Sequence, residues 1–125
     1  MIQVKIRQHL LNQAELASLV GDRIYPNYIS ETATHPAISY FRVSNVRPRI
    51  KDGHMGEARP RFQFDIWAKT YKQAVEVEMA LLRALDGLES VDDVLRSEYA
   101  GGHESYEQDV KVHHFVVDYF IFYKE

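Results

Sequence analysis

The sequence predicts a single α+β domain spanning residues 1–125. We expect a mostly antiparallel β-sheet of four to five strands, with two helices, the first of them kinked, packed on one face. Three observations predict this class. Residues 61–68 alternate apolar and mostly polar side chains, residues 70–86 repeat apolar side chains at three- and four-residue spacing, and residues 110–123 are apolar on both faces of a strand.

Composition limits the functional classes. The chain has 125 residues, no cysteine and a formal net charge of -3. It therefore offers no disulfide, no thiolate chemistry and no overall attraction to nucleic acid or to a membrane. The N-terminal segment carries charges within its apolar positions, unlike a signal peptide, and no apolar run approaches the roughly 20 residues of a membrane span. We expect a protein that works in solution, on the cytoplasmic side of the cell that makes it.

The first twenty residues predict a kinked or broken helix. Its first piece covers residues 3–11, and the spacing of Asn12 and Glu15 is that of a capping box that restarts the helix. The second piece is expected to end near Val20, with Gly21 as its C-cap. A single smooth helix is the alternative that the pattern leaves open.

The next segments predict two strands and a long connection. Ile24 and Tyr25 form a short strand that Pro26 stops or confines to a sheet edge. Residues 37–46 are apolar on both faces, which predicts an interior strand. Residues 47–60 contain two prolines and two glycines, which predict a long β-hairpin loop leading to the strand at 61–68.

A strand followed directly by a helix organises the middle of the chain. The apolar face of the strand consists of Phe62, Phe64, Ile66 and Ala68. Thr70 is the predicted N-cap of the helix 70–86, and Gly87 lies just past its end. Because only Lys69 and Thr70 separate the two patterns, the helix must turn back sharply and pack its apolar stripe on the sheet.

The C-terminal third predicts a short strand, a loop and a long strand. One short strand fits within Val91–Glu98, and Tyr99–Asp109 is expected to be an acidic loop. Val110–Tyr123 is the strongest strand of the chain. Its two apolar faces indicate that it lies centrally in the sheet or that its outer face meets a partner subunit.

The histidines do not form a predicted metal site. His113 and His114 are adjacent on a strand, so their side chains point to opposite faces and cannot bind one ion. His35, His54 and His103 lie in three different loops without ligand spacing. We interpret them as surface or packing residues and expect no metal ligands.

The acidic residues do not form a predicted catalytic site either. Asp92 and Asp93 follow a helix, where they solvate a turn. Asp118 is expected to face solvent beside Lys111 or an arginine of the next strand rather than to be a perturbed acid. The sequence has no G-x-S-x-G elbow and no glycine-rich phosphate loop. We therefore predict no catalytic residues, no cofactor and no enzymatic activity.

Two charged segments are the candidate interface. The basic one, residues 47–61, carries Arg47, Arg49, Lys51, Arg59 and Arg61, and the acidic one, residues 98–109, carries Glu98, Glu104, Glu107 and Asp109. Opposite charges on one molecule suit a head-to-tail contact between copies, which closes a ring when repeated around an axis. The alternatives for the basic hairpin are a solvated loop and a contact with nucleic-acid phosphates.

Four segments resemble a family of small proteins from tailed phages. The quoted segments are LVGDRIYP (residues 19–26), HPAISYFRVS (35–44), RFQFDIWAKTYKQAVEVEMAL (61–81) and ESYEQDVKVHHFVVDYFIF (104–122). In this order and over nearly the whole chain they are similar to the tail-completion, or tail-terminator, proteins of siphophages and of the prophages derived from them.

The resemblance implies a structural protein without catalytic residues or cofactor. Members of the family form a ring, expected to be a hexamer and in some cases formed only on a tube end, that caps the tail tube and stops its polymerisation. The implied partners are other copies of the chain, the tail-tube protein and a head-completion or connector protein, with DNA only passing through the lumen. The implied location is the head–tail junction of the virion, after assembly in the host cytoplasm.

The sequence is also compatible with other functions. The same motifs are compatible with another head–tail connector or a minor tail protein. A small nucleic-acid-binding module that uses the 47–61 hairpin, and an enzyme of unrecognised type, are further alternatives.

Overall fold

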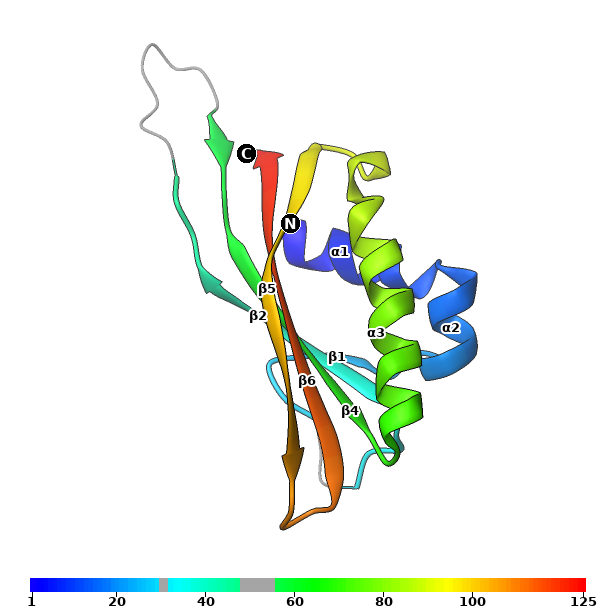
Figure 1. Cartoon of the computed structure of the whole chain (residues 1–125). Helices are drawn as coiled ribbons and strands as arrows, with labels where there is room; N and C mark the ends of the chain where they lie inside the picture. Colours follow the sequence, from blue (N-terminus) through cyan, green and yellow to red (C-terminus); the bar gives the residue numbers. More distant parts are fainter. Residues whose placement is uncertain (30–31, 48–55) are drawn as a thin grey trace.

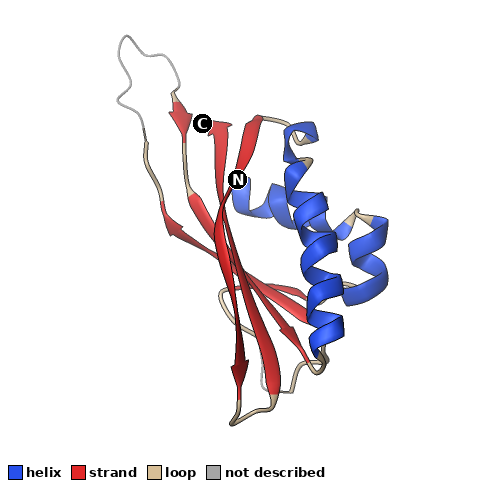
Figure 2. Cartoon of the chain, viewed as in Figure 1, coloured by secondary structure: helices blue, strands red, loops and turns tan. Residues whose placement is uncertain are grey.

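A computed structural model describes residues 1–29, 32–47 and 56–125. Within these residues the chain forms one six-stranded sheet, three α-helices and a short 3-10 helix. All helices lie against one face of the sheet (Figures 1 and 2). The result is a two-layer α+β domain, as the sequence predicts, with a helical face and an outer face that no described helix covers.

The sheet is mostly antiparallel. Its strands are β1 (Ile24–Pro26), β2 (Ala37–Ser44), β3 (Glu57–Ala58), β4 (Arg61–Ala68), β5 (Val94–Glu107) and β6 (Val112–Lys124). The pairs β2–β4, β4–β6, β3–β6 and β5–β6 are antiparallel, whereas β1 pairs parallel to β2. The sequence predicts four to five strands. The additional one is β3, whose two residues pair with the end of β6 and are too few to leave a periodic pattern.

The strand β6 is central, as predicted. It pairs with β4 on one side and with β5 on the other. Its helix-facing side chains are almost completely buried; they are Phe115, Val117, Tyr119 and Ile121. Burying four such side chains beside the apolar face of β4 provides most of the contact between the sheet and the helices, since apolar burial is the main favourable term in folding.

The predicted strand–helix unit is confirmed. The apolar face of β4 is fully buried, and α3 (Tyr71–Asp86) begins directly after Thr70. The Thr70 hydroxyl oxygen accepts a hydrogen bond from the Gln73 N–H at 3.1 Å, which satisfies one of the free donors at the helix start. Gly87 is the C-cap of α3, and the 3-10 helix η1 (Leu88–Ser90) follows it.

The N-terminal helix is broken, as one of the two alternatives predicts. It consists of α1 (Ile2–Leu11) and α2 (Ala14–Val20), and Gly21 ends α2 with a φ of 60°. The predicted capping box is wrong. Asn12 keeps helical backbone angles because its N–H still bonds to the carbonyls of α1, so the extended conformation of an N-cap falls to Gln13.

The predicted acidic loop is also wrong. Residues 99–107 continue the edge strand β5, and only the turn at 108–111 connects it to β6. The segment has a loop-like composition because it is exposed at a sheet edge. A register shift, as in a β-bulge, lies between Tyr99 and Gly101. Pairing with the strongly apolar β6 overrides the weak strand preference of the segment itself.

The long hairpin between β2 and β4 is confirmed at its base. Val46 and Arg59 exchange two backbone hydrogen bonds beyond the end of β2. Residues 48–55 of the predicted loop lie outside the described residues, and β3 belongs to its returning arm. Among the described residues, no helix is both long enough and apolar enough to cross a membrane.

Replacing Gly102 with alanine tests the pairing of β5. A Cβ atom at this position would lie 2.6 Å from the backbone oxygen of Val116 and 2.8 Å from the Tyr99 hydroxyl. We expect Gly102→Ala to lower the free energy of unfolding by about 1–3 kcal/mol, measured by chemical denaturation.

The matched control is Gly87→Ala. Its Cβ atom would meet nothing closer than 3.7 Å, so the free energy of unfolding should change by less than about 1 kcal/mol. A Gly102→Ala variant as stable as the control would contradict the pairing and would favour a loop over residues 99–109.

Candidate assembly interface

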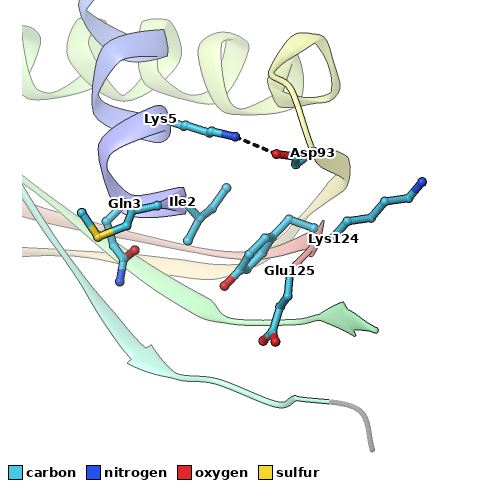
Figure 3. A pocket seen from close by; sticks show the side chains of 8 residues that line it. Ile2, Gln3, Lys5, Asp93, Lys124 and Glu125 are labelled. Carbon is cyan, nitrogen blue, oxygen red and sulfur yellow. Dashed lines mark hydrogen bonds and ion pairs between the residues drawn. The ribbon is translucent and has the colours of Figure 1, made fainter. Parts of the chain in front are cut away.

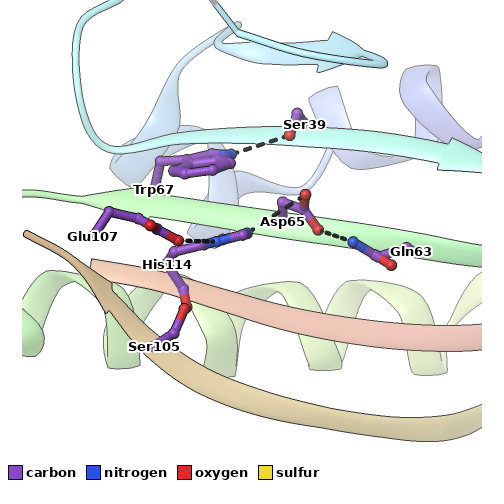
Figure 4. Close-up of polar contacts among 7 residues, drawn as sticks. All are labelled: Ser39, Gln63, Asp65, Trp67, Ser105, Glu107 and His114. Carbon is purple, nitrogen blue, oxygen red and sulfur yellow. Dashed lines mark hydrogen bonds and ion pairs between the residues drawn. The ribbon is translucent and has the colours of Figure 1, made fainter. Parts of the chain in front are cut away.

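The outer face of the sheet carries a polar cluster that joins four strands (Figure 4). At its centre lies His114 of β6, whose Nδ1 is 3.1 Å from a Glu107 carboxylate oxygen of β5 and whose Nε2 is 3.5 Å from Asp65 of β4. The imidazole stacks on Trp67 with ring centroids 3.8 Å apart. The indole N–H of Trp67 donates to the Ser39 hydroxyl of β2 at 3.1 Å.

The charge state of His114 depends on this cluster. Partial burial lowers the pKa of His114, but the carboxylates of Asp65 and Glu107 outweigh that effect and raise it above its ordinary value. The protonated ring then carries a positive charge between two negative ones. Asp65 is held in turn by the Gln63 amide at 2.7 Å. The cluster therefore fastens β5 to the centre of the sheet.

Two arginines cover aromatic rings on the same face. Arg61 lies over Phe120 at 5.5 Å and pairs with Asp118 at 2.8 Å. Arg96 lies over Phe122 at 3.7 Å. These cation–π contacts reduce the exposed apolar area of β6, because the guanidinium planes lie over the rings.

A groove of about 600 Å³ opens beside the polar cluster. Its floor includes Trp67, Asp65 and Ser39, and the exposed side chains of Tyr28 and Val110 contribute to its walls. Since aromatic and apolar side chains line much of it, the groove has the character of a protein-contact surface.

Two further ion pairs fasten segments near the two chain termini to other parts of the fold. The C-terminal Glu125 accepts two hydrogen bonds of 2.8 Å from the guanidinium of Arg47, which lowers the pKa of the Glu125 side chain. At the other side of a hollow of about 300 Å³, Lys5 of α1 donates to Asp93 at 2.7 Å (Figure 3). The base of the long hairpin is thereby tied to the end of β6.

The candidate interface residues with described surroundings have mostly local partners. Arg47 pairs with Glu125 and Arg61 with Asp118, while Glu98 pairs with Arg96 and Glu107 with His114. Glu104 accepts a hydrogen bond of 2.9 Å from the Tyr71 hydroxyl. Arg59 and Asp109 are exposed and have no ion-pair partner among the residues that the structure describes, whereas Arg49 and Lys51 lie outside those residues.

Arg47 and Glu107, one basic and one acidic candidate, lie at opposite ends of β6. Arg47 contacts the residue after the end of β6, whereas Glu107 pairs with Val112 at its start. The 13 residues of β6 separate these positions by about 40 Å. Arg61 and Glu98, by contrast, lie at the same level of the sheet, since both pair with Phe120 of β6.

The remaining polar candidates occupy structural positions. Asp92 and Asp93 lie in the turn before β5, as predicted. Asp118 contacts an arginine of the neighbouring strand, as predicted, but its side chain is only 13% exposed and does not face solvent. His113 and His114 point to opposite faces, since His113 contacts Tyr71 at the start of α3 and His114 contacts Trp67. Among the described residues, no group of three or more His, Asp or Glu side chains is arranged so that it could hold a metal ion.

Sequence reasoning missed the cluster around His114. Its members are separated by up to 75 positions, from Ser39 to His114, and no two of them are adjacent in the sequence. The one signal in the sequence is Trp67, an aromatic residue on the otherwise polar side of β4. The register of β4 with β6 places Trp67 opposite His114. That register is a tertiary property.

These features define a small α+β protein whose ionisable groups connect strands and termini and whose outer face presents aromatic, apolar and charged surface. The chain belongs to a family of tail completion proteins: the family model described as "Tail completion protein gp17" matches residues 4–124. Comparison with curated proteins gives no match.

A solved structure has the same fold. It belongs to the virion of a native gene transfer agent (GTA) particle and has a TM-score of 0.79 and 15% sequence identity, with 99% of this chain and 95% of that chain covered. At this identity the likeness concerns the fold, and it extends over the complete domain.

The raised pKa of His114 predicts a pH dependence of stability. Since protonation favours the folded state, this contribution is fully present below the unfolded pKa of 6.5 and is lost as the pH rises through the higher folded pKa. Between about pH 6 and about pH 8, the unfolding free energy of the wild type should therefore fall relative to that of His114→Gln.

The measurement is chemical denaturation of both proteins at several pH values. The comparison with the variant is needed because His35, whose pKa is lowered by burial and by Lys69 and Arg23, contributes with the opposite sign. His113→Gln, on the other face, is the control and should keep the wild-type profile. Parallel profiles for the wild type and His114→Gln would refute the coupling.

Proposed function

We propose that this chain is a structural tail-completion protein that caps a phage or prophage tail tube as a ring, stops tube polymerisation and forms the joining surface to the head. The observation that carries the proposal is the match to the tail completion family over residues 4–124. The proposed ring is a hexamer, formed in solution or only on a tube end.

The architecture supports a role without catalysis. Three of the groups with a shifted pKa, His114, Asp93 and Glu125, each pair with an opposite charge that holds a strand or a terminal segment in place. Ionisable groups with shifted pKa values occur in structural ion-pair networks as well as in active sites. The proposal therefore rests on the residues with which these groups pair and not on the pKa shifts themselves. The protein would act through its surfaces.

The charge distribution supports two different contacts. A cap between a tube and a head needs one face for each partner, and Arg47 and Glu107 lie about 40 Å apart along β6. We propose that Arg47, Arg49, Lys51, Arg59 and Arg61 form the basic part of the interface and Glu98, Glu104, Glu107 and Asp109 the acidic part. The proposed partners are the tail-tube protein, a head-completion or connector protein and further copies of this chain, with DNA passing through the lumen.

The proposed location follows from these partners. A cap of this kind would reside at the head–tail junction of the virion and would assemble in the host cytoplasm.

Light scattering of the purified protein, alone and mixed with preformed tail tubes, tests the proposal. We expect a hexamer in solution, or a monomer that forms rings at tube ends visible by electron microscopy. Tubes mixed with the protein should stop elongating when more tube protein is added. A monomer that neither binds tubes nor changes their growth would contradict the proposal.

A charge variant extends the same assay. In Arg47→Gln, Arg49→Gln, Lys51→Gln, assembly should weaken and depend less on salt, because fewer charges take part in the contact. Lys72→Gln is the control, since the Lys72 side chain is 88% exposed on α3. Assembly that is unchanged in the triple variant would remove the basic hairpin from the interface.

A further inference from the structure

The sheet has two unpaired backbone edges on opposite sides. On one side the edge is β5, which pairs with β6 alone among the described residues. On the other side, β1 covers β2 only from Ile38 to Tyr40, so the strand from Phe41 onward has no described neighbour there. Unpaired strand edges present rows of N–H and C=O groups that can pair with another chain.

The edge of β5 is long and carries neither lysine nor proline. It runs for 14 residues, Val94–Glu107, without a lysine or a proline, which natural proteins often place on exposed edges to prevent pairing. Tyr99 and Tyr106 on this strand are 57% and 47% exposed. Exposed tyrosines are enriched at protein interfaces because they provide a large contact area at low entropic cost.

The edge of β2 lies beside a hollow that can receive a side chain from β5 of another copy. A hollow of about 380 Å³ lies beside it, lined by Gln3, Pro26, Asn27, Tyr40, Phe41, Arg42 and Phe62. Val43 and Val46 are 48% and 50% exposed along the same edge. The hollow is large enough to receive an aromatic side chain such as the exposed Tyr99.

The charges of the two edges are opposite. β5 carries Glu98, Glu104 and Glu107 against a single basic residue, Arg96, whereas the unpaired part of β2 carries the exposed Arg42 and continues to Arg47. Opposite charges favour contact between different edges and disfavour contact between two copies of β5.

The two edges also lie at the same level of the sheet. The strand registers connect Arg42 to Phe62, Phe62 to Tyr119, and Tyr119 to Tyr99. Because β2 and β6 run in one direction and β4 and β5 in the other, a copy rotated about an axis nearly parallel to the strands would bring its β2 antiparallel to β5. Because the contact joins two different edges, each copy binds the next in the same way, and a series of such contacts around one axis closes a ring.

We propose that copies of this chain join edge to edge, with β5 of one copy pairing antiparallel to residues 41–46 of the next copy, which comprise the end of β2 and the two residues after it. Tyr99 of the first copy enters the hollow beside Arg42 of the second. This inference rests on the proposed ring and specifies its subunit contact: the sheet continues from one subunit into the next.

Hydrogen exchange of the backbone amides is the first test. In the assembled protein, free or on tube ends, the outward-facing amides of residues 41–46, and of residues 95–100 that lie opposite them when Arg42 is level with Tyr99, should exchange at least about 100-fold more slowly than in the monomer, because pairing removes them from water. The exposed surface of α3 should show no such change and serves as the internal reference. Unchanged exchange in both edges of an assembled ring would overturn the inference.

Cysteine cross-linking identifies the partner edge, since the natural chain has no cysteine. Arg42→Cys is combined, one at a time, with Ser97→Cys, Tyr99→Cys, Glu104→Cys or Tyr106→Cys, which covers the possible registers. Within one molecule β4 and β6 separate these positions from residue 42 by roughly 14 Å, too far for a disulfide. We expect at least one pair to give a ladder of covalent oligomers on oxidation.

The single-cysteine variants are the controls. Dimers from a β5 cysteine alone would overturn the inference in favour of contact between two β5 edges. Rings without a ladder from any pair would overturn it while leaving the proposed function standing. Absence of any oligomer, both in solution and on tail tubes, would contradict the inference and the proposed function together.

Discussion

The burial of both faces of β6 is the constraint on which the rest of the structure depends. On the helical side, Phe115, Val117 and Tyr119 pack against α3 and the apolar face of β4. On the outer side, where no described helix packs, His114 and Asp118 are held by charges from β4 and β5. A strand with apolar contacts on one face and ion pairs on the other can order neighbours on both sides, including a glycine-containing edge strand with little strand preference of its own.

This arrangement suits a protein that acts by presenting surfaces. Because the central strands of the sheet are held firmly, the two ends and the two edges of the sheet keep fixed distances and orientations relative to one another. A contact made at one edge therefore fixes where the other edge and the ends lie. The hairpin base is fastened to the chain terminus by Arg47 and Glu125, and the far end of β5 is fastened by Glu107 and His114. A cap that joins a tube to a head needs such rigidity, since each ring contact must repeat with the same geometry.

The local part of the fold follows from the sequence, and the tertiary part does not. The unit of β4, Thr70 and α3 is predictable because its period changes within two residues and its N-cap is a single hydroxyl. β5 is not predictable from its own residues, because Gly101, Gly102 and several glutamates resemble a loop until β6 provides a partner. For the same reason the sequence places Glu98, Glu104 and Glu107 in an acidic segment but does not predict the partners Arg96, Tyr71 and His114, which depend on strand register and on helix packing.

The length of tails in particles that lack this protein tests the central claim most directly. The coding sequence is deleted from the phage or prophage that carries it, and tails are measured by electron microscopy with and without the protein supplied in trans. The account predicts tails of irregular, extended length that do not join heads, and tails of uniform length when the protein is restored. Tails of normal, uniform length joined to heads in the absence of the protein would contradict it.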